Sequence, residues 1–144
     1  MTTITRLTPA EAQAKLDEGY IYLDVRSEPE FEEGHPAGAY NIPLLHSGPV
    51  GMTPNTDFVP VVRANFAKDA KLVLGCRSGG RSMRAAEMLI AEGYTNLLEQ
   101  RAGWDGARNP FGQLTEAGWS KASLPVASGA PAGRCYTDMK AKLG

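Results

Sequence analysis

The segment GCRSGGRS, residues 75–82, contains the side chains best suited to chemistry in this sequence. Its single cysteine, Cys76, ends an apolar run, and the two glycines Gly79 and Gly80 precede a helical pattern. A strand, a tight turn and a helix N-terminus in that order present several backbone N–H groups to one point, which binds anions. Glycine allows the positive φ that such a turn often requires. The segment is therefore a candidate anion cradle around a cysteine.

Two arginines, Arg77 and Arg81, place positive charge beside the sulfur of Cys76. Cationic neighbours and a helix N-terminus stabilise a thiolate relative to a thiol, so they lower the pKa of a cysteine. We therefore expect Cys76 to be a nucleophile at neutral pH. The alternative is a structural cysteine that only fills the end of a strand. Such a cysteine does not require two glycines and two arginines around it.

The elements that position this segment alternate along the chain. Short apolar or β-branched runs predict strands at residues 20–25, 39–42, 71–75 and 96–99. Helical signals occupy residues 9–19, 27–33, 58–66 and 81–92, and the first of them starts with a capping box at Thr8 and Glu11. This alternation predicts an α/β fold with a largely parallel sheet. Cys76 then lies at the carboxyl edge of the sheet, where such folds bind ligands.

Other segments give weaker signals. Residues 44–57 contain glycines and prolines without a period, which predicts a long surface loop. Residues 104–121 are expected to mix loop with short helix, and residues 105–116 form an insertion to which we assign no role. The stretch 126–133 is rich in Ala, Gly, Pro and Ser and predicts a flexible linker. The last residues, 136–143, are either a short helix or disordered.

Composition excludes several classes of protein. The chain has 144 residues, of which 42% are hydrophobic, and 15 basic against 16 acidic side chains. These values predict one globular domain without the basic surface of a nucleic-acid binder. No apolar window of about 18 residues or signal peptide is visible, so no membrane partner is expected. With two cysteines and no Cys-x-x-Cys, we expect no disulfide framework, no metal, no cofactor and a cytoplasmic location. Because Arg77, Arg81 and Arg84 lie in a stretch without acids, a local cationic site is also expected.

Residues 76–82 resemble the active-site loop of the rhodanese family of sulfurtransferases. Three further segments agree with the family's motifs in order and spacing: YLDVR at 22–26, GHPAGAYNIP at 34–43 and GWSKASLPV at 118–126. The resemblance implies a rhodanese-like domain over residues 4–126, in three α/β/α layers around a five-stranded, mostly parallel sheet. Residues 127–144 lie outside it and are expected to form a flexible C-terminal tail with a possible short helix.

The resemblance also implies an activity. Cys76 would take a sulfane sulfur from an anionic donor such as thiosulfate, hold it as a persulfide and pass it to cyanide, a thiol or a sulfur-acceptor protein. The loop residues Arg77, Ser78, Gly79, Gly80 and Arg81 would bind the substrate. Backbone N–H groups suit a persulfide anion, and an arginine fork suits the departing sulfite. Arg77 and Arg81 are the candidates for that fork.

Four residues are expected to support the loop without taking part in the chemistry: Asp24, Arg26, His35 and Ser82. Asp24 and Arg26 form either a buried pair that orients the loop or a strand-end turn with a solvated charge. His35 lies in a Gly-His-Pro-Ala-Gly turn, where hydrogen bonding to the backbone is more common than general-base catalysis. After the last predicted strand, Trp104 is either a pocket wall or a core residue.

Two other functions remain open at this stage. Phosphatases and arsenate reductases of the same fold use a longer Cys-x5-Arg loop, whereas here Ser82 occupies the position of that arginine and Arg81 comes one residue early. The shorter loop suits a single sulfur better than a phosphate. A non-catalytic sulfur carrier or protein-interaction module is the other alternative. Cys135 is either inert or able to resolve a persulfide on Cys76 as a disulfide.

Overall fold

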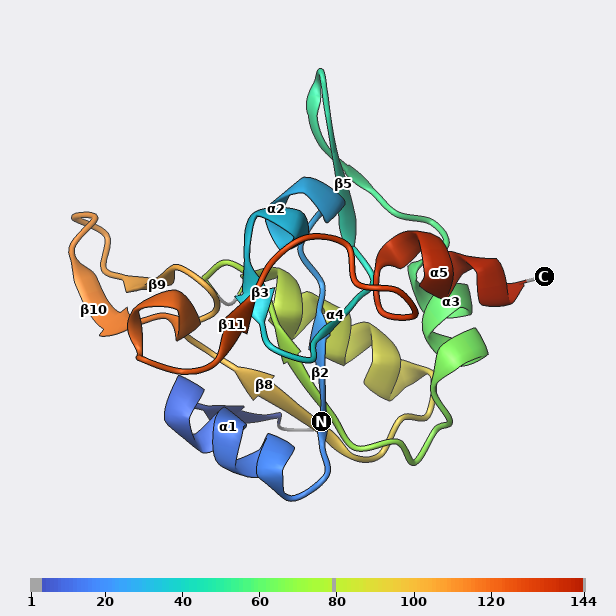
Figure 1. Ribbon diagram of the computed structural model, residues 1–144, viewed down its shortest axis with the longest axis horizontal. Helices are drawn as coiled ribbons and strands as arrows, with labels where there is room; N and C mark the ends of the chain where they lie inside the picture. The colour runs from blue at the N-terminus through green and yellow to red at the C-terminus, as the bar shows by residue number, and fades with distance from the viewer. Residues whose placement is uncertain (1–3, 79, 144) are drawn as a thin grey trace.

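A five-stranded sheet forms the centre of the molecule, shown in Figure 1 as a computed structural model that describes residues 4–78 and 80–143. The strand order is β1-β8-β7-β2-β4, and all neighbours in this sheet are parallel. The strands are β1 (Thr5–Leu7), β2 (Ile21–Asp24), β4 (Tyr40–Asn41), β7 (Leu72–Gly75) and β8 (Leu97–Gln100). This arrangement confirms the predicted fold class. Strand β1 was not among the predicted strands.

Helices cover both faces of the sheet. They are α1 (Pro9–Asp17), α2 (Glu28–Glu33), α3 (Phe58–Asn65), α4 (Gly80–Ala91) and α5 (Tyr136–Lys140). One core contains Leu72 and Leu74 of β7 together with residues of α3, α4 and α5, whereas Val73 packs in a second core with α1 and α2. Successive side chains of β7 therefore point to opposite layers, as a buried strand requires. Within the described residues, no helix is long and apolar enough to cross a membrane.

The first helix begins where the sequence predicts. The Thr8 hydroxyl accepts a hydrogen bond from the Glu11 N–H at 3.1 Å, and the Glu11 carboxylate accepts one from the Thr8 N–H at 2.8 Å. These two bonds form the expected capping box, with Pro9 at the first helical position. The helix ends before Gly19, which has a positive φ of 108°.

Two predicted irregular segments are instead β-hairpins. The expected loop at residues 44–57 contains the antiparallel strands β5 (Leu45–Gly48) and β6 (Gly51–Pro54), which project from the domain in Figure 1. The expected mixture of loop and helix contains β9 (Gly106–Arg108) and β10 (Leu114–Ala117), followed by a single 3₁₀ turn at Trp119–Lys121. The irregular loop expected in both segments was wrong, because exposed hairpins need no apolar alternation and their strands carry no hydrophobic period. The short helix expected within residues 104–121 is present as the 3₁₀ turn.

The chain beyond residue 125 packs on the domain. Strand β11 (Val126–Ala127) pairs antiparallel with β3 (His35–Pro36), and the Asn41 N–H donates to the Arg134 carbonyl at 2.9 Å. Helix α5 places Tyr136 and Met139 in the core beside α3, and a 3₁₀ turn follows at Ala141–Leu143. The segment expected to be a flexible tail therefore contributes buried side chains to the domain in this structure.

Replacement of Tyr136 by alanine tests this packing in solution. The ring is 5% exposed, and its hydroxyl accepts a hydrogen bond from the Asn55 side chain at 3.1 Å. Loss of the ring is expected to lower the free energy of unfolding by about 3 kcal/mol, because a large buried side chain leaves a cavity. Urea denaturation followed by circular dichroism measures the loss. Leu143→Ala, at a 43% exposed position of the same segment, is the control. Equal stabilities for Tyr136→Ala and wild type would show that the segment does not pack.

Candidate active site

Cys76 lies at the carboxyl end of β7, the central strand of the sheet, and directly before the segment that leads into α4. The residue is 2% exposed. Its Sγ is 3.4 Å from the hydroxyl oxygen of Ser82, which lies in the first turn of α4. Gly79 lies outside the described residues. Gly80 begins α4, and a Cβ added there would meet no atom within 4 Å, so the surrounding space does not require glycine at that position.

The segment that follows β8, residues 103–105, contacts the backbone of the cysteine loop. The Trp104 N–H donates to the Cys76 carbonyl at 2.8 Å, and the Asp105 N–H donates to the Arg77 carbonyl at 3.0 Å. Gly103 has a φ of 70°, and a Cβ there would be 2.4 Å from the Arg77 carbonyl oxygen. Glycine is therefore required at this position both for its backbone conformation and for the close approach.

The buried Gln100 side chain fixes Gly103 in turn. Its amide oxygen accepts a hydrogen bond from the Gly103 N–H at 2.8 Å, and its amide nitrogen donates to the Gly103 carbonyl at 2.9 Å. The same nitrogen donates to the Tyr22 hydroxyl at 3.3 Å. This pairing imitates a backbone hydrogen-bond pair at the end of β8. The loop that bears Cys76 is thus tied to two neighbouring strands.

The two arginines of the loop are both paired with carboxylates. Arg81 donates to both carboxylate oxygens of Glu30 on α2, at 2.7 and 3.0 Å. Arg77 donates through Nε to Asp105 at 2.8 Å. The excess of positive charge expected from the local sequence is therefore offset at these two arginines, because the fold brings acids from distant parts of the chain to them. Arg84, the third member, is exposed on α4.

Glu30 is a carboxylate whose pKa lies well below its usual range. Burial alone would raise its pKa, but hydrogen bonds from Arg81 and Ser27 and the charge of Arg81 outweigh burial and lower the pKa to about 2. The carboxylate also completes the cap of α2, because both the N–H and the hydroxyl of Ser27 donate to it. Glu30 therefore joins the start of α2 to the start of α4.

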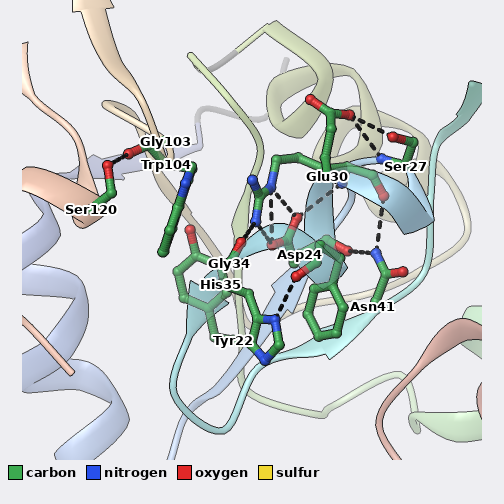
Figure 2. A network of polar contacts seen from close by, with 12 residues as sticks. Tyr22, Asp24, Ser27, Glu30, Gly34, His35, Asn41, Gly103, Trp104 and Ser120 are labelled. Atoms are coloured by element: carbon green, nitrogen blue, oxygen red, sulfur yellow. Dashed lines mark hydrogen bonds and ion pairs between the residues drawn. The ribbon is translucent and has the colours of Figure 1, made fainter. Parts of the chain in front are cut away.

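A buried ion pair connects β2 to the same region, as Figure 2 shows. The guanidinium of Arg26 is 2.8 Å from the Asp24 carboxylate and also donates to the Gly34 carbonyl at 2.6 Å. The Asn41 amide nitrogen donates to the backbone carbonyls of Asp24 and Arg26, at 3.0 and 2.9 Å. Of the two interpretations of Asp24 and Arg26, the structure has the buried pair. Arg26 lies under the Trp104 ring, 5.1 Å from its centre.

His35 packs in the core of this region. The residue is 1% exposed, its Nδ1 is 2.7 Å from the Phe31 carbonyl oxygen, and its ring stacks on the Phe31 ring with centres 3.7 Å apart. Figure 2 shows the imidazole beside this carbonyl. The structure thus gives His35 the backbone hydrogen bond that was the alternative to general-base catalysis.

Two adjoining pockets open over the loop. The first has a volume of about 230 Å³, and the following residues line it: Arg26, Glu30, Glu33, Arg77, Trp104 and Asp105. The second has about 380 Å³ and lies between the loop and the β9–β10 hairpin, with Arg77, Ser78, Asp105 and Arg108 among its lining residues. Trp104 is therefore a pocket wall, and the insertion at residues 105–116 contributes to the second pocket. Arg77 and Asp105 belong to both.

Other predicted features are located as follows. Cys135 is half-buried at the N-terminus of α5, where its Sγ is 3.5 Å from an Asp138 oxygen. Arg101 pairs with Glu116 of β10 at 2.9 Å. In the described part of the chain, no cluster of three or more His, Cys, Asp or Glu side chains is arranged to hold a metal ion.

Sequence reasoning missed four residues that shape the site: Glu30, Glu99, Gln100 and Asp105. Glu30 and Asp105 are separated from their arginine partners by 51 and 28 residues, so no local pattern indicates the pairs. The other two carried a signal. Glu99 and Gln100 are polar residues at the end of an otherwise apolar strand pattern, and both are fully buried. Buried polar groups at the carboxyl edge of a parallel sheet indicate a built site.

The protein thus has an α/β fold with a parallel sheet covered on both faces. Its candidate active site is a buried cysteine between the central strand and a helix N-terminus. The chain belongs to the rhodanese-like domain family, whose profile matches residues 8–109. It is 36% identical over 108 residues to thiosulfate sulfurtransferase 16, chloroplastic, of Arabidopsis thaliana. These residues are 75% of this chain and 80% of that protein.

Two further comparisons agree with this membership. Senescence-associated protein DIN1 of Raphanus sativus is 33% identical over 108 residues, which are 75% of this chain but only 52% of that protein. The crystal structure of Rv0390 from M. tuberculosis matches with a TM-score of 0.74 and 26% identity, over 89% of this chain and all of that one. The chain thus spans about half the length of some relatives and the whole length of others.

The ion pair of Glu30 predicts a specific dependence of stability on pH. Because folding lowers the pKa of Glu30 from 4.5 to about 2, its contribution to stability is present above about pH 4.5 and is lost as the pH falls towards 2. We expect Glu30→Gln to be less stable than wild type by about 1–2 kcal/mol at neutral pH, a value reduced for partial solvent exposure. Urea unfolding at several pH values measures this difference.

The difference between Glu30→Gln and wild type should shrink as the pH approaches 2, where Glu30 itself becomes neutral. Glu32→Gln changes the same charge at an exposed position of α2 and is the matched control. A stability difference for Glu30→Gln that stays constant down to acidic pH would contradict the assigned ion pair.

Proposed function

We propose that this protein is a sulfurtransferase that carries a sulfane sulfur as a persulfide on Cys76. The donor is a small anion such as thiosulfate, and the acceptor is cyanide, a thiol or a sulfur-acceptor protein. The observation that carries the proposal is the place of Cys76 between the end of the buried strand β7 and the N-terminus of α4. The partial positive charge of a helix N-terminus stabilises both a thiolate and a persulfide anion.

The chemistry consists of two displacements at sulfur. The Cys76 thiolate attacks the outer sulfur of thiosulfate, a new S–S bond forms, and the old S–S bond breaks with its electron pair leaving on sulfite. The acceptor then attacks the outer sulfur of the persulfide, and the electron pair of that S–S bond returns to Cys76. No external oxidant or reductant is consumed. A reducing compartment suits this cycle because it keeps Cys76 from forming disulfides, so we propose the cytoplasm.

The two loop arginines have different parts in this proposal. The Arg77 side chain is 64% exposed and lines both pockets, so an incoming anion can compete with Asp105 for it. The Arg81 side chain is 16% exposed and is held by two hydrogen bonds to Glu30. The hydrogen bonds that Arg81 donates to Glu30 and, to a smaller extent, negative charge on Cys76 raise the pKa of Arg81. We assign donor binding to Arg77 and stabilisation of the sulfur anion to Arg81.

Substitution of each arginine by alanine separates these roles. For Arg77→Ala, we expect the KM for thiosulfate to rise about tenfold, the loss typical of one charge-assisted contact, with little change in stability. For Arg81→Ala, we expect a lower kcat and a loss of about 1–3 kcal/mol in stability, because Glu30 loses its partner. Arg84→Ala, on the exposed side of α4, is the control. A wild-type KM in Arg77→Ala would exclude the assignment of donor binding.

Intact-mass measurement after incubation with thiosulfate tests the activity itself. Wild type should gain one sulfur atom and Cys76→Ala none. Cys135→Ala should keep the gain, because that thiol lies at the N-terminus of α5, outside the loop. The same proteins are then assayed for thiocyanate formation from thiosulfate and cyanide, and for hydrolysis of an aryl phosphate. Aryl phosphate hydrolysis without a sulfur adduct or thiocyanate would sink the proposal in favour of a phosphatase.

A further inference from the structure

A buried row of polar groups leads from the sulfur of Cys76 into the sheet. Cys76 Sγ is 3.4 Å from Ser82 Oγ, and Ser82 Oγ is 2.5 Å from Oε2 of Glu99 on β8. The other oxygen of Glu99, Oε1, accepts a hydrogen bond from Arg6 Nε on β1 at 2.7 Å. Ser82 and Glu99 are both fully buried, whereas the Arg6 side chain is 43% exposed. The row therefore connects the reacting sulfur with the surface through α4 and two strands.

The register of the sheet builds this row. Glu99 is the partner of Arg6 across the β1–β8 pair and of Leu74 across the β8–β7 pair. Leu74 packs in the core beside α4, and side chains at paired positions of a parallel sheet lie on the same face. Glu99 therefore points towards α4, where Ser82 meets it. The contact does not depend on a flexible surface side chain.

The two ends of the row, Glu99 and Cys76, have different charged neighbours. Arg6 of β1 contacts Glu99, and the charge of Glu99 contributes to the raised pKa of Arg101, whose main cause is the hydrogen bond to Glu116. At the other end, the pKa of Arg81 is raised mainly by its hydrogen bond to Glu30 and, to a smaller extent, by negative charge on Cys76. A thiolate at Cys76 therefore has a cation and the N-terminus of α4 beside it. A second negative charge on Glu99, two hydrogen bonds away, would oppose that thiolate.

We propose that Glu99 accepts the proton of the Cys76 thiol through Ser82. The S–H bond breaks as its proton passes to Ser82 Oγ, and the original hydroxyl proton of Ser82 passes to Glu99 Oε2. The products are a thiolate, a re-formed serine hydroxyl that now donates to the sulfur, and a neutral carboxylic acid. Protons and charge balance, because the negative charge moves from Glu99 to Cys76. The inference rests on the proposed function only in that Cys76 reacts as a thiolate.

The effect of removing Glu99 on the pH at which the Cys76 thiolate forms distinguishes this role from two simpler roles of Glu99. If the carboxylate were only a nearby negative charge, its removal would let the thiolate form at lower pH. If Glu99 only supported the fold, its removal would not change the pH dependence of the reaction of Cys76. If Glu99 takes the proton through Ser82 and holds it at the pH of the measurement, its removal moves thiolate formation to higher pH. Glu99 does not touch the sulfur, so it is a positioning residue that acts through Ser82.

The rate of alkylation by iodoacetamide as a function of pH distinguishes these roles. The experiment uses a Cys135→Ala background, so that Cys76 alone reacts, and compares Glu99→Gln, Ser82→Ala and the double variant. Glutamine keeps the shape and can accept the Ser82 hydrogen bond, but it cannot take up a proton. We expect Glu99→Gln and Ser82→Ala to react about tenfold more slowly at about pH 6, which corresponds to a shift of one pH unit. At high pH, where the thiol ionises in every variant, their rates should equal that of wild type.

The double variant should react no more slowly than either single variant, because both substitutions interrupt one path. Glu116→Gln removes a carboxylate from the surface pair with Arg101 and is the matched control. Circular dichroism establishes that each variant is folded. If Glu99→Gln does not fold, Ser82→Ala decides alone, because it keeps the Glu99 pair with Arg6. An unchanged or faster reaction of Ser82→Ala at about pH 6 would overturn the proposal. Alkylation needs no sulfur donor, so failure of sulfur transfer gives a separate result.

Discussion

The close approach of Gly103 to the backbone of Cys76 and Arg77 is the constraint on which the rest of the site depends. A Cβ at this position would be within 2.6 Å of the carbonyl oxygens of both residues, so only glycine fits there. Because glycine allows this close approach, the N–H groups of Trp104 and Asp105 reach those carbonyls. Trp104 is thereby placed over Arg26, and Asp105 beside Arg77. The ends of β7 and β8 thus form one unit with the pocket wall.

The charges around this unit are balanced locally. Each of the arginines at the site has its own carboxylate: Arg26 with Asp24, Arg77 with Asp105, and Arg81 with Glu30. Buried or half-buried pairs of this kind add little net stability, but they fix geometry because each partner is costly to leave alone. Only the Arg77 pair is largely exposed. An anionic ligand therefore meets a fixed scaffold with one exchangeable guanidinium, and the selectivity of the pocket depends on competition between that ligand and Asp105.

The local parts of this structure could be predicted from the sequence, and the non-local parts could not. The capping box at Thr8 and the strand-turn-helix around Cys76 are short patterns with a direct physical cause. Partners such as Glu30 for Arg81 depend on which helix the fold brings alongside, and no spacing reveals them. The hairpin at β5 and β6 was missed because its residues are mostly exposed and carry no apolar alternation. The packing of Tyr136 was missed because the residues before its helix, 126–133, are rich in Ala, Gly, Pro and Ser, and because α5 itself buries few side chains, Tyr136 and Met139.

The sheet itself explains why a carboxylate can lie beneath a cysteine that needs a negative charge of its own. The registers β1–β8 and β8–β7 align Arg6, Glu99 and Leu74 in one row across three strands. Arg6 offsets the cost of burying a charged Glu99, and Ser82 provides the single hydroxyl between that charge and the sulfur. Were the register shifted by one residue, Gln100 would face α4, and Glu99 would face the opposite core. The proton path and the hydrogen bonds of Gln100 to Gly103 thus depend on the same alignment, so the sheet fixes the support of the loop and its electrostatics together.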